Sequence, residues 1–472
     1  MYHFFRPIYE PHNDQAREEV RELASALGLT MTGTKGQKYS VILSSYLRLV
    51  TWVMPERDKV IWPVGNDNKQ KKQWAYFPMA GATTIQQVRS ALIEKGYIRK
   101  LTRSDVSHMF GDVAFMDELA ALMGVSRSFS GPMRYTINGD LLDKDALNSC
   151  EFVEAHKPHV LVSLKEDYSD KIQRRIDRQS SPKMPLQEMV KKFGRHYSKA
   201  RLPVLEMNEY WRQHPLEQLN NTNLPNDFYA SATRIYHHED LRSGGRWYGS
   251  WNDMQSWERL NLLIDGEAVV EIDLNASQVT LFSSLRSQPM KMTGEWEDAY
   301  KTVTEYLSYD EPSETVRDKV KQVVVELIGA GNPNKDKPSI DRESPFDESA
   351  ASIKQFQEIR DLALKVFPAL NELNKKKRLD FSGFLSFHEA AIMTETLLKL
   401  KEEGVVAYPV HDCWIVKRSD IDVAVTIIRK VINSYVTTHQ RKYNLPVSNL
   451  SVALSIERKG HSKQRLSGCY WT

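Results

Sequence analysis

Apolar positions in the second half of the chain follow two different periods, and together they predict a mixed α+β fold. Short apolar runs with β-branched residues, typical of strands in a buried sheet, occupy residues 267–274, 405–410, 414–417 and 450–457. Apolar residues three and four positions apart, typical of amphipathic helices, recur over residues 312–329, 350–373, 387–403 and 420–435. The stretch 331–345 is rich in Gly, Pro, Asp, Asn and Lys, which predicts a loop.

The first part of the chain shows helical periods and one short strand. The predicted helices cover residues 14–27, 39–50 and 85–95. Gly96 ends the third helix, and the run 97–101 has a strand pattern. A helix, a glycine and a strand in this order are what the recognition helix and wing of a winged helix-turn-helix would give. We interpret residues 1–145 as a winged-helix-like or thumb-like nucleic-acid-binding region, and a plain helical scaffold stays open as the alternative.

Residues 146–232 combine short elements of both kinds, which indicates a mixed connecting or thumb-like region. A strand is predicted at 159–164 and helices at 185–193 and 205–213. Pro and Asn cluster over residues 220–226, and this composition predicts a loop or domain boundary.

Composition changes this picture little, but it excludes some classes of protein. A hydrophobic fraction of 41% is enough for real cores, and 472 residues predict two to four structural units. Apolar runs never reach the roughly 20 residues that cross a bilayer, so we expect no membrane partner. The start of the chain lacks the basic-then-apolar layout of a signal peptide, and we expect a cytoplasmic protein.

Charge and cysteine content leave the choice of partner open. The net charge is +3, and local basic runs occur at residues 69–72, 171–178 and 375–378. Such runs neutralise phosphates in nucleic-acid-binding proteins, although solvated faces have the same composition. Cys150, Cys413 and Cys469 form no CxxC pair and no zinc signature, so we expect reduced structural thiols.

Two acidic residues stand where apolar strands end. Asp273 lies near the end of the run 267–274, and Asp412 lies in the turn between the runs 405–410 and 414–417. A carboxylate at the end of a buried strand is costly unless it pairs with or binds a cation. Two such strands side by side would place both carboxylates at one pair of Mg²⁺ ions, with Mn²⁺ as a second possibility. Helix capping or an ordinary salt bridge is the alternative for either residue.

The order of these residues resembles a known family. The Asp273 segment resembles motif A, and His411-Asp412 resembles motif C, of polymerase I-like (family A) DNA polymerases and the phage-type single-subunit RNA polymerases. Arg317 and Lys321 between them resemble motif B, in which an arginine and a lysine on one helix face grip the incoming triphosphate. The resemblance covers roughly residues 230–472 and follows the family's order A, B, C.

The resemblance implies a right-hand polymerase. Its palm would be an antiparallel sheet formed by residues 233–290 and 381–472, and its fingers would be helical and formed by residues 291–380. The implied cofactor is a pair of Mg²⁺ ions held by Asp273 and Asp412. The implied partners are a DNA or RNA template-primer and nucleoside triphosphates.

The chain departs from the family where the sugar and the base are recognised. Family A DNA polymerases carry a glutamate shortly after the motif A aspartate, where it excludes the ribose 2′-OH. Here the candidates are Gln278 and Thr280, and neither is acidic, so we expect weak sugar discrimination. Val325 and Gly329 stand where motif B has aromatic residues, and Cys413 follows the motif C aspartate.

Further side chains are candidates for contacts with nucleic acid. They are Arg242, Arg246, Tyr248, Arg259, His388, Glu389 and His411. The first three lie in a glycine-rich segment that resembles the Arg-x-Tyr segments of phage-type enzymes, and a hairpin with exposed side chains is the alternative. His388 and Glu389 open the helix that leads into motif C, and a solvated helix start is the alternative for both.

These observations favour a template-directed nucleotidyltransferase. A small DNA polymerase or primase-polymerase of a mobile element, tolerant of ribonucleotides, is the specific form we expect. The N-terminal half shows no paired-carboxylate exonuclease pattern, so proofreading is not expected. The alternatives are a non-catalytic replication initiator or regulator with a degenerate palm, and a template-independent terminal transferase.

Overall fold

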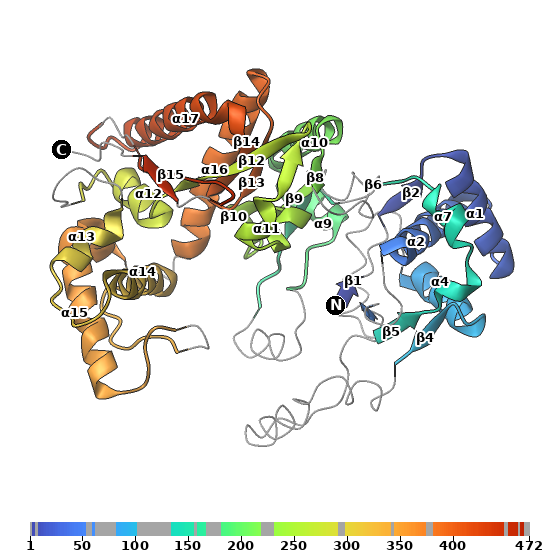
Figure 1. Ribbon diagram of the computed structural model, residues 1–472, viewed down its shortest axis with the longest axis horizontal. Helices are drawn as coiled ribbons and strands as arrows, with labels where there is room; N and C mark the ends of the chain where they lie inside the picture. Colours follow the sequence, from blue (N-terminus) through green and yellow to red (C-terminus); the bar gives the residue numbers. More distant parts are fainter. Residues whose placement is uncertain are drawn as a thin grey trace. The chain divides into compact units, whose positions relative to one another are not determined.

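The computed structural model describes most of the chain, and Figure 1 shows its elements. The described residues are 2–4, 8–52, 59–61, 82–101, 134–154, 158–166, 181–218, 231–290, 298–340, 344–373, 381–447, 452–460 and 463–466. Several features of the sequence lie outside these residues, namely the basic runs 69–72, 171–178 and 375–378, the boundary at 220–226, and Cys469.

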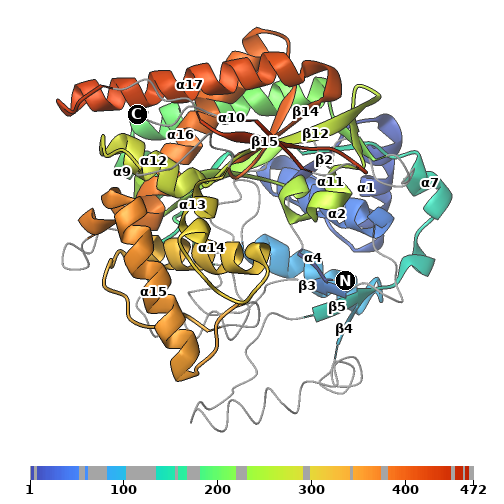
Figure 2. The same cartoon turned by 60° about the vertical axis from the view of Figure 1, so that its left-hand side comes forward.

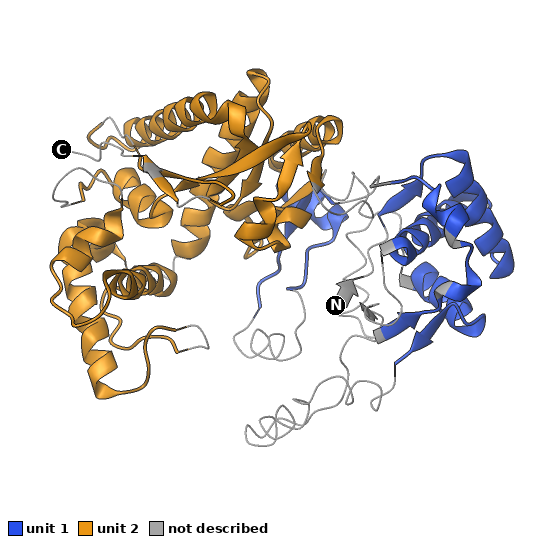
Figure 3. Cartoon of the chain, in the orientation of Figure 1, with its two compact units in different colours: residues 1–195 blue, residues 196–472 orange. Residues whose placement is uncertain are grey.

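The chain divides into two compact units, residues 1–195 and residues 196–472 (Figure 3). Each unit buries apolar side chains of its own. The division falls within the stretch 146–232, which the sequence indicates as a connecting region.

Unit 1 combines helices with short strands. Its helices are α1 (Asp14–Ala26), α2 (Gly33–Trp52), α4 (Ala82–Glu94), α7 (Lys144–Asn148) and α9 (Leu186–Phe193). One sheet has the order β1 (Tyr2–Phe4), β3 (Lys59–Ile61), β5 (Arg134–Ile137), β4 (Ile98–Lys100). A second pairs β2 (Tyr9–Pro11) with β6 (Phe152–Glu154). The strand β7 spans Val160–Val162.

α4 is the helix that the sequence interprets as a recognition helix. The residues that it buries in the core of unit 1 are Ile85, Val88 and Leu92. Arg89, its single arginine or lysine, is also buried. The exposed face of α4 therefore offers no cation to phosphate, and the nearest exposed basic residues are Lys95, Arg99 and Lys100. Nucleic-acid binding by unit 1 stays a prediction.

Seven strands in the described part of unit 2 form one antiparallel sheet. They are β8 (Leu216–Gln218), β11 (Leu262–Ile264), β12 (Glu267–Leu274), β13 (Ala407–Val410), β14 (Cys413–Lys417), β15 (Leu454–Glu457) and β16 (Gln464–Leu466). β12 lies at the centre, because β14 pairs along one edge while β11 and β15 share the other. β12 has the bounds predicted from its apolar run.

Three long helices and a hairpin pack with this sheet. The helices are α10 (Arg195–Gln213), α16 (Phe381–Glu402) and α17 (Ile421–Lys442), and the hairpin consists of β9 (Ala232–His237) and β10 (Asp240–Gly249). Buried tryptophans join the layers: Trp211 of α10 donates its indole N–H to the Ala407 carbonyl at 2.8 Å, and Trp247 of β10 donates to Thr394 Oγ1 of α16 at 3.0 Å. These bonds satisfy the polar ends of large apolar rings.

A helical lobe follows β12 in the chain (Figure 2). It consists of α12 (Ser277–Leu285), α13 (Ala299–Glu305), α14 (Ser313–Ala330) and α15 (Ala350–Val366), which enclose an apolar cluster of their own. Among the residues described between α14 and α15 there is no helix or strand, as predicted for the loop 331–345. The helices and antiparallel sheets confirm the α+β class.

Several predicted helix ends were wrong. α10 begins ten residues before the predicted start at 205 and continues through Pro203. The helix predicted over 350–373 stops at Val366, and residues Pro368–Glu372 form a 3-10 turn, because proline cannot continue the hydrogen-bond ladder. α17 extends to Lys442 rather than 435. In the described part of the chain, no helix is both long and apolar enough to cross a membrane.

Candidate functional site

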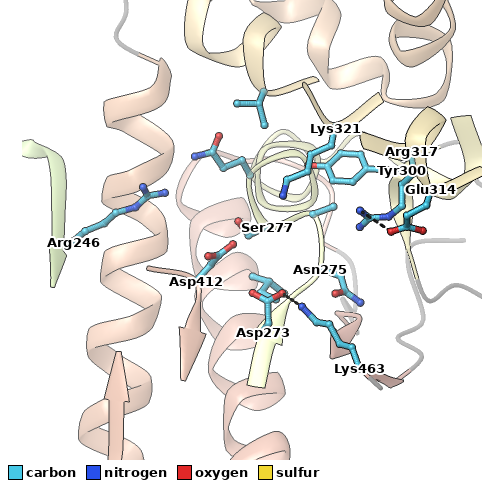
Figure 4. A pocket seen from close by; sticks show the side chains of 14 residues that line it. Arg246, Asp273, Asn275, Ser277, Tyr300, Glu314, Arg317, Lys321, Asp412 and Lys463 are labelled. Atoms are coloured by element: carbon cyan, nitrogen blue, oxygen red, sulfur yellow. Dashed lines mark hydrogen bonds and ion pairs between the residues drawn. The ribbon is translucent and has the colours of Figure 1, made fainter. Parts of the chain in front are cut away.

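A pocket of about 450 Å³ opens within unit 2, where the central strand of the sheet meets the helical lobe (Figure 4). Carboxylates and cationic groups line it together. The lining residues are Arg246, Asp273, Leu274, Asn275, Ala276, Ser277, Gln278, Tyr300, Glu314, Arg317, Lys321, Val325, Asp412 and Lys463.

The sheet register brings Asp273 and Asp412 together. Asp273 on β12 lies opposite Cys413 on β14, and Asp412 directly precedes Cys413 in the β13–β14 turn. The Leu274 amide donates to the Asp412 carbonyl at 3.1 Å, which fixes the turn against the end of β12. Neighbouring strands are about 4.8 Å apart, so side chains from these two positions reach the same space. Figure 4 shows both carboxylates entering the pocket from below the helical lobe.

His411 shapes the turn that carries Asp412. Its φ is +56°, in the left-handed region that non-glycine residues rarely occupy, and it forms a two-residue connection with Asp412 between β13 and β14. The ring of Tyr248 on β10 meets the His411 ring edge-on at 5.7 Å. Burial and the nearby Arg246 charge lower the pKa of His411, so the imidazole stays neutral beside the carboxylates.

The two carboxylates repel one another in a partly desolvated place. Burial, and then the charge of Asp412, raise the pKa of Asp273 to about 6. Lys463 opposes this rise, because its Nζ lies 2.8 Å from Asp273 Oδ2. The sequence reasoning missed Lys463, since it belongs to no motif and lies far along the chain from its partner. Asp273 is therefore already paired with a positive charge, the ammonium group of Lys463.

α14 presents two basic side chains to the same pocket. Arg317 and Lys321 lie one helical turn apart, and both line it. Arg317 is held by Asp298, whose Oδ2 lies 2.5 Å from Nε, and its guanidinium lies 5.8 Å from the centre of the Tyr300 ring. Lys321 makes no ion pair with any residue that the structure describes, and it points its ammonium into the pocket (Figure 4).

Only one of the two sugar-gate candidates reaches the pocket. Gln278, in the first turn of α12, lines it. Thr280 is 2% exposed and faces the packed side of α12, so its assignment is corrected. Val325 lines the pocket where the resemblance would place an aromatic ring, and Gly329 does not. The aromatic residue present is Tyr300, which comes from α13.

Arg246 and Glu389 form a buried unit beside the pocket. Arg246 Nη2 pairs with Glu389 Oε2, and Ser277 Oγ donates to Glu389 Oε1 at 2.7 Å. Glu389 is 5% exposed and lies on α16, so it contacts protein groups rather than solvent. The prediction that Glu389 faces nucleic acid is corrected. It orients Arg246, which does line the pocket.

Three further candidates lie away from the pocket. His388 is buried between α16 and α17, where its Nδ1 meets the Tyr435 hydroxyl at 2.8 Å. Arg259 binds Glu271 and the Met254 carbonyl, each at 2.5 Å. Arg242 is mostly exposed and pairs with its neighbour Asp240. The polar groups of His388 and Arg259 are engaged by other parts of the protein, and neither side chain lines the pocket.

Two carboxylates in the pocket suit a Mg²⁺ ion whose other ligands are water and phosphate oxygens. No group of three or more His, Cys, Asp or Glu side chains placed to hold a metal occurs among the described residues. Mg²⁺ often takes only one or two carboxylates and fills its remaining positions with water and phosphate oxygens. Asp273 and Asp412 provide that pair, and the ammonium of Lys463 marks a place where positive charge is already stabilised.

Cys150 and Cys413 are buried free thiols.

Comparison with known proteins identifies no family. No protein-family model and no curated protein matches the sequence. Among solved structures, the chain is similar to the POL domain of Pol1 from M. smegmatis in complex with DNA primer-template and dNTP. The identity is 10%, the TM-score is 0.32, and 88% of each chain is covered. A likeness of this degree carries no argument about function.

Proposed function

We propose that this chain is a template-directed nucleotidyltransferase, with the seven-stranded sheet as its palm and the helical lobe as its fingers. One observation carries the proposal: Asp273 and Asp412 share a pocket with Arg317 and Lys321. A pair of carboxylates facing a pair of cations is the arrangement that phosphoryl transfer from a triphosphate requires, since metal ions and phosphates both need neutralising.

Each pocket side chain has a role in this proposal. Asp273 and Asp412 would hold two Mg²⁺ ions, and Mn²⁺ suits the same oxygen donors. Such ions, when bound, supply positive charge at the attacking and leaving oxygens. Arg317 and Lys321 would bind the triphosphate, with Arg317 kept in place by Asp298. Arg246, oriented by Glu389, would contact the nucleic acid near the growing end.

An ordinary salt bridge explains the pocket less well. Lys463 alone would account for the buried charge of Asp273. It would not account for Asp412, which makes no ion pair with any described residue although it lies beside Asp273 at a strand end. A non-catalytic initiator with a degenerate palm would have no need of the second carboxylate or of Lys321. The proposed enzyme needs both.

Primer extension by the Asp412→Asn variant tests the proposal. Because the amide has no charge to hold a divalent cation, we expect nucleotide addition with Mg²⁺ to fall by about a thousandfold or more. The matched control is Asp310→Asn, which removes an exposed carboxylate outside the pocket and should leave the rate unchanged. Full activity of the Asp412 variant would show that the site is wrong.

The same assay separates the remaining alternatives. Reactions with dNTPs or NTPs, each with and without a template strand, distinguish a polymerase from a terminal transferase. The proposal expects the added nucleotide to follow the template base. Equal extension with and without template would replace template-directed synthesis by terminal transfer at the same site.

A further inference from the structure

Lys463 is a pocket residue that belongs to none of the three motifs. It lies directly before β16, the strand that pairs with β15, and its side chain is 39% exposed. Its ammonium is 2.8 Å from Asp273 Oδ2, the carboxylate proposed to bind metal. Figure 4 shows Lys463 reaching Asp273 from the side of the pocket opposite Arg246. A divalent cation on Asp273 would compete for the place that this ammonium occupies.

The other basic side chains of the pocket show what would happen to the displaced ammonium. Arg246 is neutralised by Glu389 and Arg317 by Asp298, and neither of these acids lines the pocket. Lys321 has no ion-pair partner among the described residues. Once metal ions take over Asp273 and Asp412, Lys463 also loses its partner. The pocket then contains two ammonium groups and excess metal charge against one further lining carboxylate, Glu314, so it favours a highly charged anion.

We propose that Lys463 is a nucleotide-binding residue that exchanges partners. Its ammonium neutralises Asp273 while the site lacks divalent cations, and it binds the phosphates of the incoming triphosphate when cations bind Asp273. The proposal rests on the proposed function, because it assumes that Asp273 binds metal and that the ligand is a triphosphate.

The chemistry of lysine suits this exchange. Its ammonium is a compact point charge on a flexible four-carbon stem, so it can move between neighbouring anions without a fixed donor geometry. Partial exposure leaves the side chain free to turn, unlike Lys319, which is buried against Glu311 and Gln355. A purely structural role is the alternative, in which the ion pair fastens the start of β16 to β12. The two roles predict different signs for the effect of removing the charge.

Two binding measurements on the full-length Lys463→Gln variant test the proposal. The first is Mn²⁺ binding without nucleotide, measured by electron paramagnetic resonance. Because the competing ammonium is gone, Mn²⁺ should bind about three- to tenfold more tightly. The second is dATP binding with Mg²⁺ and no primer, measured by calorimetry. The loss of a charge-assisted contact should weaken dATP binding about tenfold.

Two further variants serve as controls. Lys459→Gln removes an exposed lysine from the same β15–β16 turn, outside the pocket, and should change neither affinity. Lys463→Arg keeps a positive charge, and arginine also binds phosphate, so dATP binding should stay within about threefold of the wild type. The opposite signs of the two Lys463→Gln effects, together with this rescue, support partner exchange.

Other outcomes overturn it. If Lys463→Gln changes neither affinity, or weakens both, the ion pair is structural. Mn²⁺ binding by Asp412→Asn separates this failure from that of the proposed function. If Asp412→Asn loses Mn²⁺ while Lys463→Gln changes nothing, only the Lys463 inference fails. If Asp412→Asn binds Mn²⁺ as the wild type does, the metal site itself is wrong and both proposals fall.

Discussion

Gln278 reaches the pocket because the chain turns sharply after β12. Ala276, at the start of α12, has a φ of +49° in the left-handed region, and this turn directs the first residues of the helix back toward Asp273. Gln278 is the one side chain of the two sugar-gate candidates that lines the pocket. Its neutral amide can accept a hydrogen bond from a ribose 2′-OH or donate one to it. In the family that the sequence resembles, a glutamate excludes this hydroxyl.

If the proposed function holds, Gln278 predicts the sugar preference of the wild type. One hydrogen-bonding contact changes specificity by about 1–3 kcal/mol, so ribonucleotides should be used within about two orders of magnitude of deoxyribonucleotides. Gln278→Glu should raise the dATP preference about 10- to 100-fold. The measurement is the ratio of kcat/KM for dATP and ATP on one primed template. Gln213→Glu, exposed and outside the pocket, is the matched control. An unchanged ratio in Gln278→Glu would place the gate elsewhere.

For single residues, the sequence predicts side-chain positions best on strands, where the backbone alone determines which way a side chain points. Asp273 and Asp412 were expected at strand ends, and strand alternation with antiparallel pairing then determines where they lie. Helical residues are harder, because tertiary packing decides which face is buried. Thr280 and His388 were assigned to the site although both face packed interiors. Lys463 could not be found from the sequence, because its contact with Asp273 joins distant segments.

Packing of helix α16 against helix α17 buries titratable side chains between them. His388 of α16 lies among Tyr435, His439 and Lys442 of α17 and the aromatic rings of its own helix. Burial, followed by the charges of His439 and Lys442, lowers the pKa of His388 to about 4. The histidine is therefore neutral in the folded protein over a range of pH in which the unfolded chain is protonated.

Acid should loosen this helix pair. An unfolded histidine binds a proton near pH 6.5, whereas folded His388 resists protonation until about pH 4. Stability is thus fully present above pH 6.5 and declines as the pH falls toward 4, by up to about 1.4 kcal/mol per pH unit for one proton. His388→Gln should reduce the slope of the melting temperature against pH in this window. His196→Gln, an exposed substitution on α10, should preserve the wild-type slope. Equal slopes in all three proteins would contradict the assignment.

Element predictions from the sequence were most accurate for the sheet. The apolar run of β12 has no proline and ends at polar residues, so its bounds could be predicted without tertiary information. α10 was predicted too short, because Pro203 resembles a helix break although packing of Trp211 and Met207 holds the helix together around it. The strand β16 has few apolar residues, so the sequence pattern does not predict it. It is recognised as a strand in the structure because it pairs with β15.

At the scale of the whole molecule, the pocket belongs entirely to one unit. Every residue that lines it lies within residues 196–472, and so do the two apolar clusters that support it. The core of unit 1 lies within residues 1–195 and shares no side chain with them. Metal and nucleotide binding should therefore not depend on unit 1, whereas unit 1 is the predicted source of extra contacts with nucleic acid.

Removing unit 1 tests this division. A fragment of residues 196–472 should bind Mn²⁺ with the affinity of the full chain, because all of the proposed ligands remain. Its affinity for primer-template DNA should be lower and should depend less steeply on salt, since phosphate contacts from unit 1 are lost. The measurement is DNA affinity against salt concentration for both proteins. An identical salt slope would leave unit 1 as a helical scaffold without contact to nucleic acid.

The central position of β12 also has a consequence for how the protein is made. Residues 271–273 pair with both β14 and β15, and both of these strands are synthesised long after β12 has left the ribosome. Until then, the nascent chain exposes the unpaired backbone of an apolar strand, and such edges recruit strands from other chains. A ribosome that stalls before residue 454 would therefore release a product that aggregates, so correct folding of unit 2 depends on uninterrupted translation through β15.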